Sequence, residues 1–398
     1  MTRLELDAHK RVIGRHTTGR PGPTVVATGG VHGNEPAGLH ALRRVLARLA
    51  GERMPLRGEL WAVAGNLRAL AEDRRFIDRD LNRRWTREAM SELVNAGPGE
   101  AAEDHEQLEL LTTLAPLLVR GGPPIVFLDL HTTSGPAAPF SCMPDVLRNR
   151  AIALAMPIPL VLGLEEVLEG SLLGYLCDMG HIGVAVEAGQ HRDPATVGFH
   201  EAALWIALVA AGCLDEGHVP DLAEHRGRLI AANRGLPPVV EIRVRHGVRP
   251  DEEPFTMEPG FENFQPIIKG QMVARDRNGP ILAPRTGLMM LPRYQGQGDD
   301  GFFVASPVSP LVLKLSATAR RLRLERFMPL LPGVQRHPEL VGQFVTPPAT
   351  GLGDQLLNWL GYRHMRPHGE RQVYARRHEG RTPPPPPEVR ALAARGST

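Results

Sequence analysis

The sequence predicts an α/β protein with a mostly parallel central sheet, followed by a smaller all-β domain. From Thr24 to about Val219, short β-rich apolar runs alternate with longer helical patterns, as a sheet with crossover helices requires. After Pro238 the pattern changes to short strands separated by Gly, Pro, Asp and Asn. The 398 residues also exceed the roughly 250 to 300 that one hydrophobic core normally serves. We therefore expect an α/β domain over 1–236 and a β domain over 237–319.

Apolar patterning defines the individual elements. The strands expected in the first domain are Thr24–Thr28, Leu60–Ala64, Ile125–Leu130, Pro159–Leu164 and Gly183–Val186. Its expected helices include Ala37–Leu49 and Ala102–Val119, which have apolar residues at helical spacing, and Glu201–Ala211. The strands expected in the second domain are Val239–Val244, Gln271–Ala274, Ile281–Leu282 and Leu288–Leu291. This second domain is similar to the barrel-sandwich half-barrels of biotinyl and lipoyl carriers, but its turn at 276–279 lacks their modifiable lysine, which disfavours a swinging-arm role.

The C-terminal stretch, 320–398, has a different composition from the rest of the chain. It is rich in Arg, His and Pro and contains five consecutive prolines, Pro383 to Pro387. Such runs favour extended chain without internal hydrogen bonds. We therefore expect a C-terminal extension that is extended and partly disordered, at least past Glu379.

Composition excludes several classes of function. The formal net charge of +2 produces no strong field of the kind that nucleic-acid binders show. The longest apolar stretch, Ala202 to Leu214, is about a third shorter than the roughly 20 residues of a membrane span. The first residues lack the apolar core of a secretory signal, so we expect a cytoplasmic protein. Three widely spaced cysteines fit neither a disulfide framework nor a thiolate zinc site.

The first chemical motif follows the strand Thr24–Thr28 and reads Gly-Gly-Val-His-Gly-Asn-Glu-Pro over 29–36. It places His32 and Glu35 three positions apart in a glycine-rich loop, a spacing at which both side chains can reach one metal ion. The motif matches neither the phosphate loop nor the dinucleotide fingerprint. A simple turn with an acidic residue at the start of the next helix remains the alternative.

The second motif ends the buried strand run Ile125–Leu130 and supplies His131. Asp129 lies on the same side of that strand, so it either orients the imidazole of His131 or bonds to a neighbouring loop. Two histidines and one glutamate form the ligand set of a catalytic zinc, because they leave the fourth position open for water. The sequence thus favours a hydrolase.

The third motif is the apolar strand Gly183–Val186, which ends in Glu187. Beside a metal-activated water such a carboxylate can take a proton and pass it to a leaving nitrogen. If this motif is considered without the other two, a helix-capping or salt-bridged glutamate is the simpler interpretation. All three motifs lie at carboxyl ends of strands, where open α/β sheets bind ligands. Arg68 follows Leu60–Ala64 at the same edge, where it could stabilise an oxyanion. Downstream, Asn82 and Arg83 place an amide beside a guanidinium, a pair suited to a carboxylate.

These motifs resemble the aspartoacylase and succinylglutamate desuccinylase family of the zinc carboxypeptidase clan. The resemblance runs through 30–35, 66–68, 78–83, 129–133 and 186–187, and less specifically through 295–301. It implies a zinc-carboxypeptidase-like fold with one Zn²⁺ per chain. The roles it implies are metal ligation by His32, Glu35 and His131, proton transfer by Glu187, assistance at the carbonyl oxygen by Arg68, and substrate binding by Asn82, Arg83 and Tyr294.

One feature departs from the family. Aspartoacylases have an arginine shortly before the catalytic glutamate that binds a second carboxylate, and here no arginine occurs between Arg150 and Arg192. Tyr175 lies in that stretch but carries no charge. The substrate is therefore expected to have one anionic anchor, which puts N-acylaspartate in doubt.

The expected function is hydrolysis of the amide bond of an N-acyl amino acid or a small carboxylate-bearing peptide or isopeptide by a zinc-activated water, assisted by Glu187. Alternatives are a carboxypeptidase-like exopeptidase acting on β-aspartyl peptides, a zinc esterase and a non-catalytic metal-binding homologue. We expect a small-molecule or short peptide partner, no nucleic acid and no membrane. The sequence leaves a homo-oligomer open.

Overall fold

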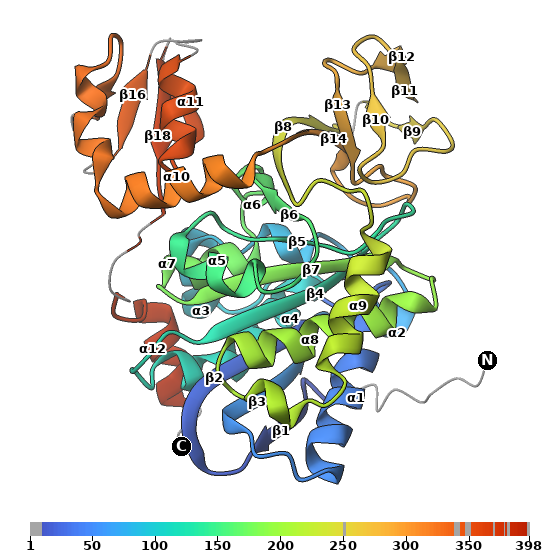
Figure 1. Ribbon diagram of the computed structural model, residues 1–398, viewed down its shortest axis with the longest axis vertical. Coiled ribbons are helices and arrows are strands. Elements are labelled where there is room, and N and C mark those ends of the chain that lie inside the picture. Colours follow the sequence, from blue (N-terminus) through green and yellow to red (C-terminus); the bar gives the residue numbers. More distant parts are fainter. Residues whose placement is uncertain are drawn as a thin grey trace.

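The computed structural model describes residues 10–249, 252–337, 343–346, 352–368, 371–377, 379 and 383–395. Its body is a mixed α/β unit built on an 11-stranded sheet with the order β1-β3-β2-β4-β7-β5-β6-β8-β14-β13-β10 (Figure 1). The strands of this sheet are β1 (Val12–Thr17), β2 (Arg20–Gly29), β3 (Arg57–Ala64), β4 (Val126–Thr133), β5 (Phe140–Cys142), β6 (Leu160–Leu162), β7 (Ile182–Gln190), β8 (Val239–Gly247), β10 (Pro266–Ile267), β13 (Gly287–Met290) and β14 (Asp300–Pro307).

The strands that carry the candidate ligands form the parallel centre of this sheet. β2 pairs in parallel with both β3 and β4, and β4 pairs in parallel with β7. The carboxyl ends of these four strands therefore lie along one edge, as the sequence predicted. The short β5 runs antiparallel to β7, and the mutually parallel pairs β5–β6 and β6–β8 continue the sheet beyond it.

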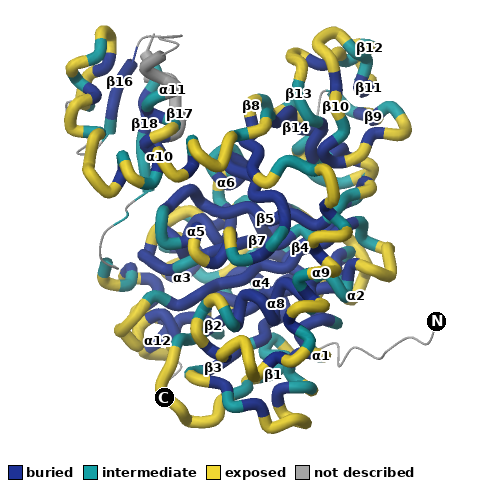
Figure 2. Tube along the Cα trace, viewed as in Figure 1, coloured by how far each residue is buried: buried dark blue, intermediate teal, exposed yellow. Residues whose placement is uncertain are grey.

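Helices cover both faces of the central strands. Alternate residues of β2 point to opposite faces, so Val25 and Ala27 pack into one apolar core while Val26 packs into a second. All three side chains are fully buried. In Figure 2 the centre of the body around β4, β5 and β7 is likewise coloured as buried. A strand buried on both faces reads as a continuous apolar run, which explains why these strands were visible in the sequence.

Two sets of helices make these cores. Residues of α1, α8 and α9 contribute to the first core, and residues of α3, α4, α7 and α12 to the second. The helices of the body are α1 (Ala37–Gly51), α2 (Leu67–Glu72), η1 (Leu81–Arg83), α3 (Arg87–Ala96), α4 (Ala102–Leu118), α5 (Leu147–Ala153), α6 (Leu164–Val167), α7 (Leu172–Asp178), α8 (Ala195–Ala210), η2 (Glu216–His218) and α9 (Leu222–Ala232).

The expected small β domain is only partly separate from the body. The region has its own apolar core and a three-stranded antiparallel sheet made of β9 (Thr256–Met257), β11 (Met272–Asp276) and β12 (Gly279–Leu282). However, β8, β14, β13 and β10 extend the large sheet, because β8 pairs in parallel with β6 through Leu160 and Val239. The region is thus continuous with the body through the main sheet.

The C-terminal region differs from the extended tail that its composition predicted. Its described residues form a four-stranded antiparallel sheet in the order β15-β16-β18-β17, with an apolar core of its own. Its elements are α10 (Pro310–Arg321), η4 (Leu324–Leu330), β15 (Gln335–Arg336), β16 (Phe344–Thr346), α11 (Leu352–Trp359), β17 (Arg363–His368), β18 (Arg371–Ala375) and α12 (Pro387–Arg395).

The proline run leads into a helix that packs on the body. α12 contacts α3 and α4, lies beside them in Figure 1, and buries Val389 and Leu392 in the second core. Tyr175 donates a hydrogen bond to Glu388 of α12 at 3.1 Å. The expected extended chain past Glu379 is therefore wrong for 387–395, because apolar residues at helical spacing after the prolines give this segment a buried face. Within the described residues, every helix is too short or too polar to cross a bilayer.

Candidate active site

The loop between β2 and α1 carries two of the three candidate metal ligands. Gly30 adopts a left-handed backbone conformation with φ of 68°, which turns the chain away from the end of β2. Gly33 packs against α2 so closely that a Cβ there would lie 2.0 Å from the carbonyl carbon of Ala69. The backbone N–H of Glu35 donates to the carbonyl of His32 at 3.1 Å, which folds the loop back on itself. The glycines thus bring the side chains of His32 and Glu35 to the same point.

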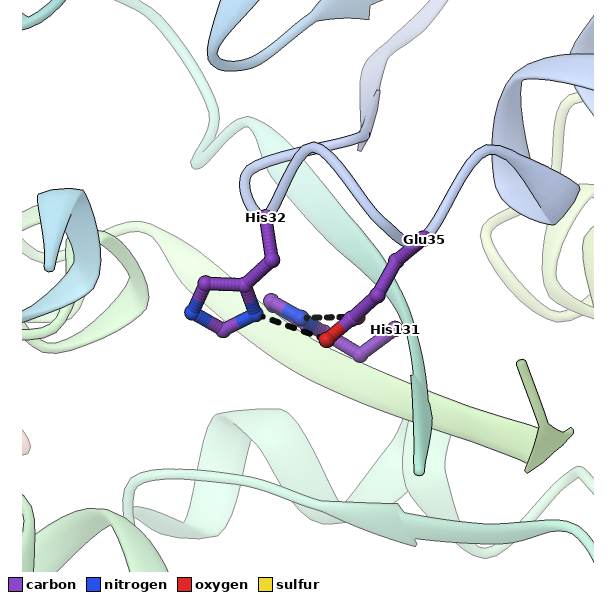
Figure 3. A group of neighbouring side chains, drawn as sticks. All are labelled: His32, Glu35 and His131. Carbon is purple, nitrogen blue, oxygen red and sulfur yellow. Dashed lines mark hydrogen bonds and ion pairs between the residues drawn. The ribbon is translucent and has the colours of Figure 1, made fainter. Parts of the chain in front are cut away.

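The third candidate ligand comes from β4 and meets the other two at the edge of the sheet. Nδ1 of His32 lies 2.9 Å from Oε1 of Glu35, and Nδ1 of His131 lies 3.1 Å from Oε2 of Glu35 (Figure 3). The ligand atoms of the three residues all lie within 4.8 Å of one another, and all three side chains are buried. Two imidazole nitrogens and a carboxylate oxygen at this spacing are a donor set that fits a divalent metal ion.

The charges within this cluster stabilise one another. Burial would raise the pKa of Glu35, but His32 and His131 beside it hold that pKa well below its usual range. Burial would lower the pKa of His131, but Asp129 and Glu35 hold it well above the ordinary value. A buried carboxylate between two histidines is therefore ionised and ready to bind a cation.

A carboxylate lies next to the Nε2 atom of each histidine, on the side of the ring away from Glu35. Oδ2 of Asp129 lies 2.9 Å from Nε2 of His131, which is the orienting contact considered in the sequence analysis. Oδ1 of Asp80 lies 3.3 Å from Nε2 of His32. When each Nε2 carries the proton for its carboxylate, each Nδ1 presents a lone pair to the metal position. Asp80 was not predicted as a site residue, although it lies two residues before Asn82 in the motif at 78–83.

Glu187 lies directly beside the triad. Its Cα pairs in register with that of His131 across β4 and β7, and its side chain lines the same cleft as the three candidate ligands. Among the described residues, no group hydrogen-bonds to its buried Oε2. Burial raises the pKa of Glu187 to about 8. A carboxyl group with a free oxygen at this position can exchange a proton with a reacting water.

Arg68 does not reach the cleft, so its expected role at the carbonyl oxygen is wrong. Asn66 caps α2 by accepting a hydrogen bond from the backbone N–H of Ala69, which places Arg68 in the first turn of the helix. From there its guanidinium extends to α4, 2.7 Å from Glu106. The cleft arginine next to the triad is instead Arg75, whose guanidinium lies 2.9 Å from Asp80 and 3.6 Å from Glu35. Nothing in an arginine-rich sequence distinguished Arg75.

The expected carboxylate-binding pair is in the cleft. Asn82 and Arg83 form η1 and both line the cleft with the triad. Arg83 donates to Asp300 at 2.8 Å, and its buried Nε has no hydrogen-bond partner among the described residues. Asn82 accepts from the backbone N–H of Leu172 through its oxygen. Arg83, which lines the cleft, therefore retains one N–H without a partner among the described residues.

Tyr294 faces away from the cleft, which corrects its expected substrate-binding role. Its hydroxyl donates to the carbonyl of Glu258 at 2.8 Å and accepts from the backbone N–H of Phe261, both in the β region. Neighbouring Gln295 and Gln297 line the cleft instead. Gln295 accepts a hydrogen bond from Asn34 in the ligand loop, so this segment closes one side of the site. Tyr175, the other tyrosine considered, is held by α12.

The arrangement combines groups with complementary chemistry in one cleft. Three converging ligands can hold a divalent cation, which polarises a carbonyl group and makes a water more acidic. Glu187 can move a proton, and Arg75 can stabilise negative charge on an oxygen. Arg83 can bind an anionic group. Together these are the components of a hydrolytic site.

Comparisons with known proteins agree with this geometry. Residues 21–206 match the succinylglutamate desuccinylase/aspartoacylase catalytic domain. A probable aspartoacylase of Parasynechococcus marenigrum (strain WH8102) is 33% identical over 175 residues, which are 42% of this chain and 52% of that protein. The chain thus spans about half the length of this relative.

Solved structures show the same fold. A succinylglutamate desuccinylase/aspartoacylase from Rhodobacter sphaeroides aligns with a TM-score of 0.53 at 20% identity, covering 73% of this chain and 87% of that one. A succinylglutamate desuccinylase from Vibrio cholerae aligns with a TM-score of 0.55 at 16% identity, covering 73% and 83%. The matched stretch 21–206 carries the triad and Glu187, and it is this part of the chain that is similar to the succinylglutamate desuccinylase/aspartoacylase catalytic domain.

Proposed function

We propose that the protein is a zinc-dependent hydrolase that cleaves the amide bond of an N-acyl amino acid. The observation that carries the proposal is the convergence of His32, Glu35 and His131 within 4.8 Å, beside a buried carboxyl oxygen of Glu187 that has no partner among the described residues. A ligand set of two histidines and one glutamate is typical of catalytic zinc. A bound zinc would polarise the substrate carbonyl and lower the pKa of a water.

The side chains of this protein would then complete the reaction. Glu187 takes a proton from the attacking water as the water's oxygen bonds to the carbonyl carbon. Arg75 stabilises the negative charge that develops on the carbonyl oxygen, the role that the sequence analysis gave to Arg68. Glu187 then returns the proton to the leaving nitrogen, and the C–N bond breaks to give an amine and a carboxylic acid, which loses its own proton to solvent. Asp129 and Asp80 keep the two imidazoles oriented throughout.

The cleft also supports a substrate that carries a carboxylate. Arg83 is half-buried and lines the cleft with Asn82 beside it, and its Nε has no hydrogen-bond partner among the described residues. A guanidinium and an amide in this arrangement bind a carboxylate through charge-assisted hydrogen bonds. An N-acyl amino acid provides both the amide to be cleaved and the carboxylate to be held. The relatives' names, aspartoacylase and succinylglutamate desuccinylase, support an acylated amino acid as the substrate class.

Metal content and turnover test this proposal together. We expect one zinc per chain by elemental analysis, and hydrolysis of at least one substrate in a panel of N-acyl amino acids. β-Aspartyl dipeptides and the corresponding oxygen esters complete the panel and decide between amidase, exopeptidase and esterase. Glu187→Gln should retain zinc and lose at least about 100-fold in kcat. Absence of bound metal after zinc addition, or turnover that is indifferent to Glu187, would contradict the proposal.

A further inference from the structure

The cleft continues along the sheet beyond the reacting groups. Ala185 and Glu187 both line the cleft and, being two residues apart on β7, lie about 7 Å apart along one face of the strand. Cys142 pairs in register with Ala185 and also lines the cleft. The small side chains of Ala185 and Cys142 leave space beside Glu187 at this level. Leu164, Leu168 and Phe303 form the apolar wall of this part.

One carboxyl group stands in this inner part of the cleft. Glu165 of α6 is 6% exposed and lines the cleft. Its Oε2 accepts a hydrogen bond from Ser171 at 2.6 Å, and its Oε1 lies 3.9 Å from the thiol of Cys142. Among the described residues, no cationic group lies within 4 Å of this carboxyl. The other acidic residues that line the cleft differ: Glu35 and Asp300 have ionic partners, and Glu187 is one of the reacting groups.

A buried carboxyl group without a cation is costly unless something else compensates for it. Burial raises the pKa of Glu165, although the hydrogen bond from Ser171 and the charges of Arg377 and His131 act in the opposite direction. Ser171 cannot supply a full charge, and the thiol of Cys142 is a weak donor. A cationic group arriving with the substrate would provide the missing partner.

We propose that Glu165 determines substrate specificity by binding a cationic group on the side chain of the amino acid, so that the substrate is an N-acyl amino acid with an ammonium or guanidinium side chain. This inference rests on the proposed function. It places the α-carboxylate at Arg83, the amide beside Glu187 and the side-chain cation at Glu165. The intervening methylene groups would then lie against the apolar wall of Leu164, Leu168 and Phe303.

The two binding groups, Arg83 and Glu165, line the same cleft. Burial would lower the pKa of Arg83, but the charges of Asp80, Asp300 and, more weakly, Glu165 raise it. The segment that carries Glu165 is also tied to η1, because the backbone N–H of Leu172 donates to Asn82 at 2.9 Å. A carboxylate and an ammonium of the same amino acid would match this pair.

A series of Nα-acetyl amino acids with side chains of similar length tests the assignment. N-acetyl-lysine, N-acetylornithine, the neutral N-acetylnorleucine and the anionic N-acetylglutamate are compared by kcat/KM in the zinc-loaded protein and in Glu165→Gln. We expect the cationic substrates to be preferred, and Glu165→Gln to lower their kcat/KM by about 10- to 100-fold while changing N-acetylnorleucine by less than about threefold. The control is Glu166→Gln, which alters a neighbouring carboxyl outside the cleft lining and should keep the preference.

A binding experiment separates this inference from the proposed function. Calorimetric titration of Glu187→Gln with lysine and with norleucine measures recognition of the amine product without turnover. Tighter binding of lysine that disappears in the Glu165→Gln/Glu187→Gln double variant would support the role of Glu165, even if no amide in the panel were hydrolysed. A preference for N-acetylglutamate or N-acetylnorleucine would overturn it, as would an equal loss for every substrate in Glu165→Gln.

Discussion

The hydrogen bond between Asp129 and His131 allows a quantitative test of the metal site. Asp129 is 1% exposed, with Oδ2 2.9 Å from His131 and Oδ1 accepting from the hydroxyl of Thr28 at 2.5 Å. In Asp129→Asn the amide oxygen can still accept from Nε2 of His131. The amide nitrogen can face Thr28, whose hydroxyl accepts as well as donates. The substitution therefore removes one negative charge and preserves the shape.

The expected cost follows from the kind of hydrogen bond that is lost. A hydrogen bond to an ionised group contributes about 1.5–3 kcal/mol, whereas a neutral one contributes about 1 kcal/mol. Asp129→Asn should therefore weaken zinc binding by about 0.5–2 kcal/mol, which is roughly 2- to 30-fold in Kd. Substitutions of carboxylates behind metal-bound histidines typically cost about 10- to 100-fold, which overlaps this range.

Zinc affinity is measured by competition with a chelator, and the stability of the metal-free protein by denaturant unfolding. Thr28→Val is the matched control, because it changes the other side of the same carboxylate and leaves the contact with His131. We expect Thr28→Val to change Kd by less than about threefold. An unchanged Kd in Asp129→Asn, or an equal loss in both variants, would refute the orienting role of Asp129.

Two further predictions concern stability and catalysis. Burial lowers the pKa of His181 from 6.5 to about 4, and its Nδ1 accepts a hydrogen bond from the backbone N–H of Ile125. Because the unfolded chain binds this proton more readily, protonation of His181 should lower the free energy of unfolding by about 3 kcal/mol as pH falls from 6.5 to 4. Denaturant unfolding at several pH values should show a shallower loss in His181→Gln, and an identical slope would contradict the assignment. Arg75→Ala should lower kcat at least about 100-fold. The side chain of Arg68 is 43% exposed and its guanidinium binds Glu106. Arg68→Ala should therefore stay within about threefold in kcat and within about 1 kcal/mol in unfolding free energy. A larger loss of kcat in Arg68→Ala than in Arg75→Ala would restore the role first given to Arg68.

The parallel centre of the sheet was predictable because burial on both faces leaves a strong local signal. The predicted strand Thr24–Thr28 lies within β2, Arg20–Gly29, and the predicted Ile125–Leu130 overlaps β4, Val126–Thr133. His32, Glu35 and His131 follow these strands or lie near their ends. Strand direction alone therefore brings them to one edge, and the triad could be assembled without knowing any tertiary contact.

Pairings between distant segments left no such signal. β5 is three residues long and runs against β7, so neither its length nor its neighbours mark it as part of the sheet. β8 was predicted as a strand, but nothing in its sequence shows that Val239 pairs with Leu160 of β6. This pairing joins the β region to the body. The helix α12 was hidden by the proline run that precedes it, since such a run alone favours extended chain.

The carbonyl-oxygen role was predicted for Arg68, but Arg75 occupies the matching position. This difference shows why the groups around the metal position are harder to predict than the ligands. Arg75 lies in the irregular segment between α2 and η1, whose path depends on Glu103 of α4. The buried carboxylate of Glu103 accepts hydrogen bonds from the backbone N–H groups of Ile77, Asp78 and Arg79, at 2.7, 3.0 and 3.1 Å. This contact fixes the loop from a helix more than 20 residues later in the chain. The sheet sets the positions of ligands at strand ends, whereas the position of Arg75 depends on a tertiary contact that no local sequence pattern reveals.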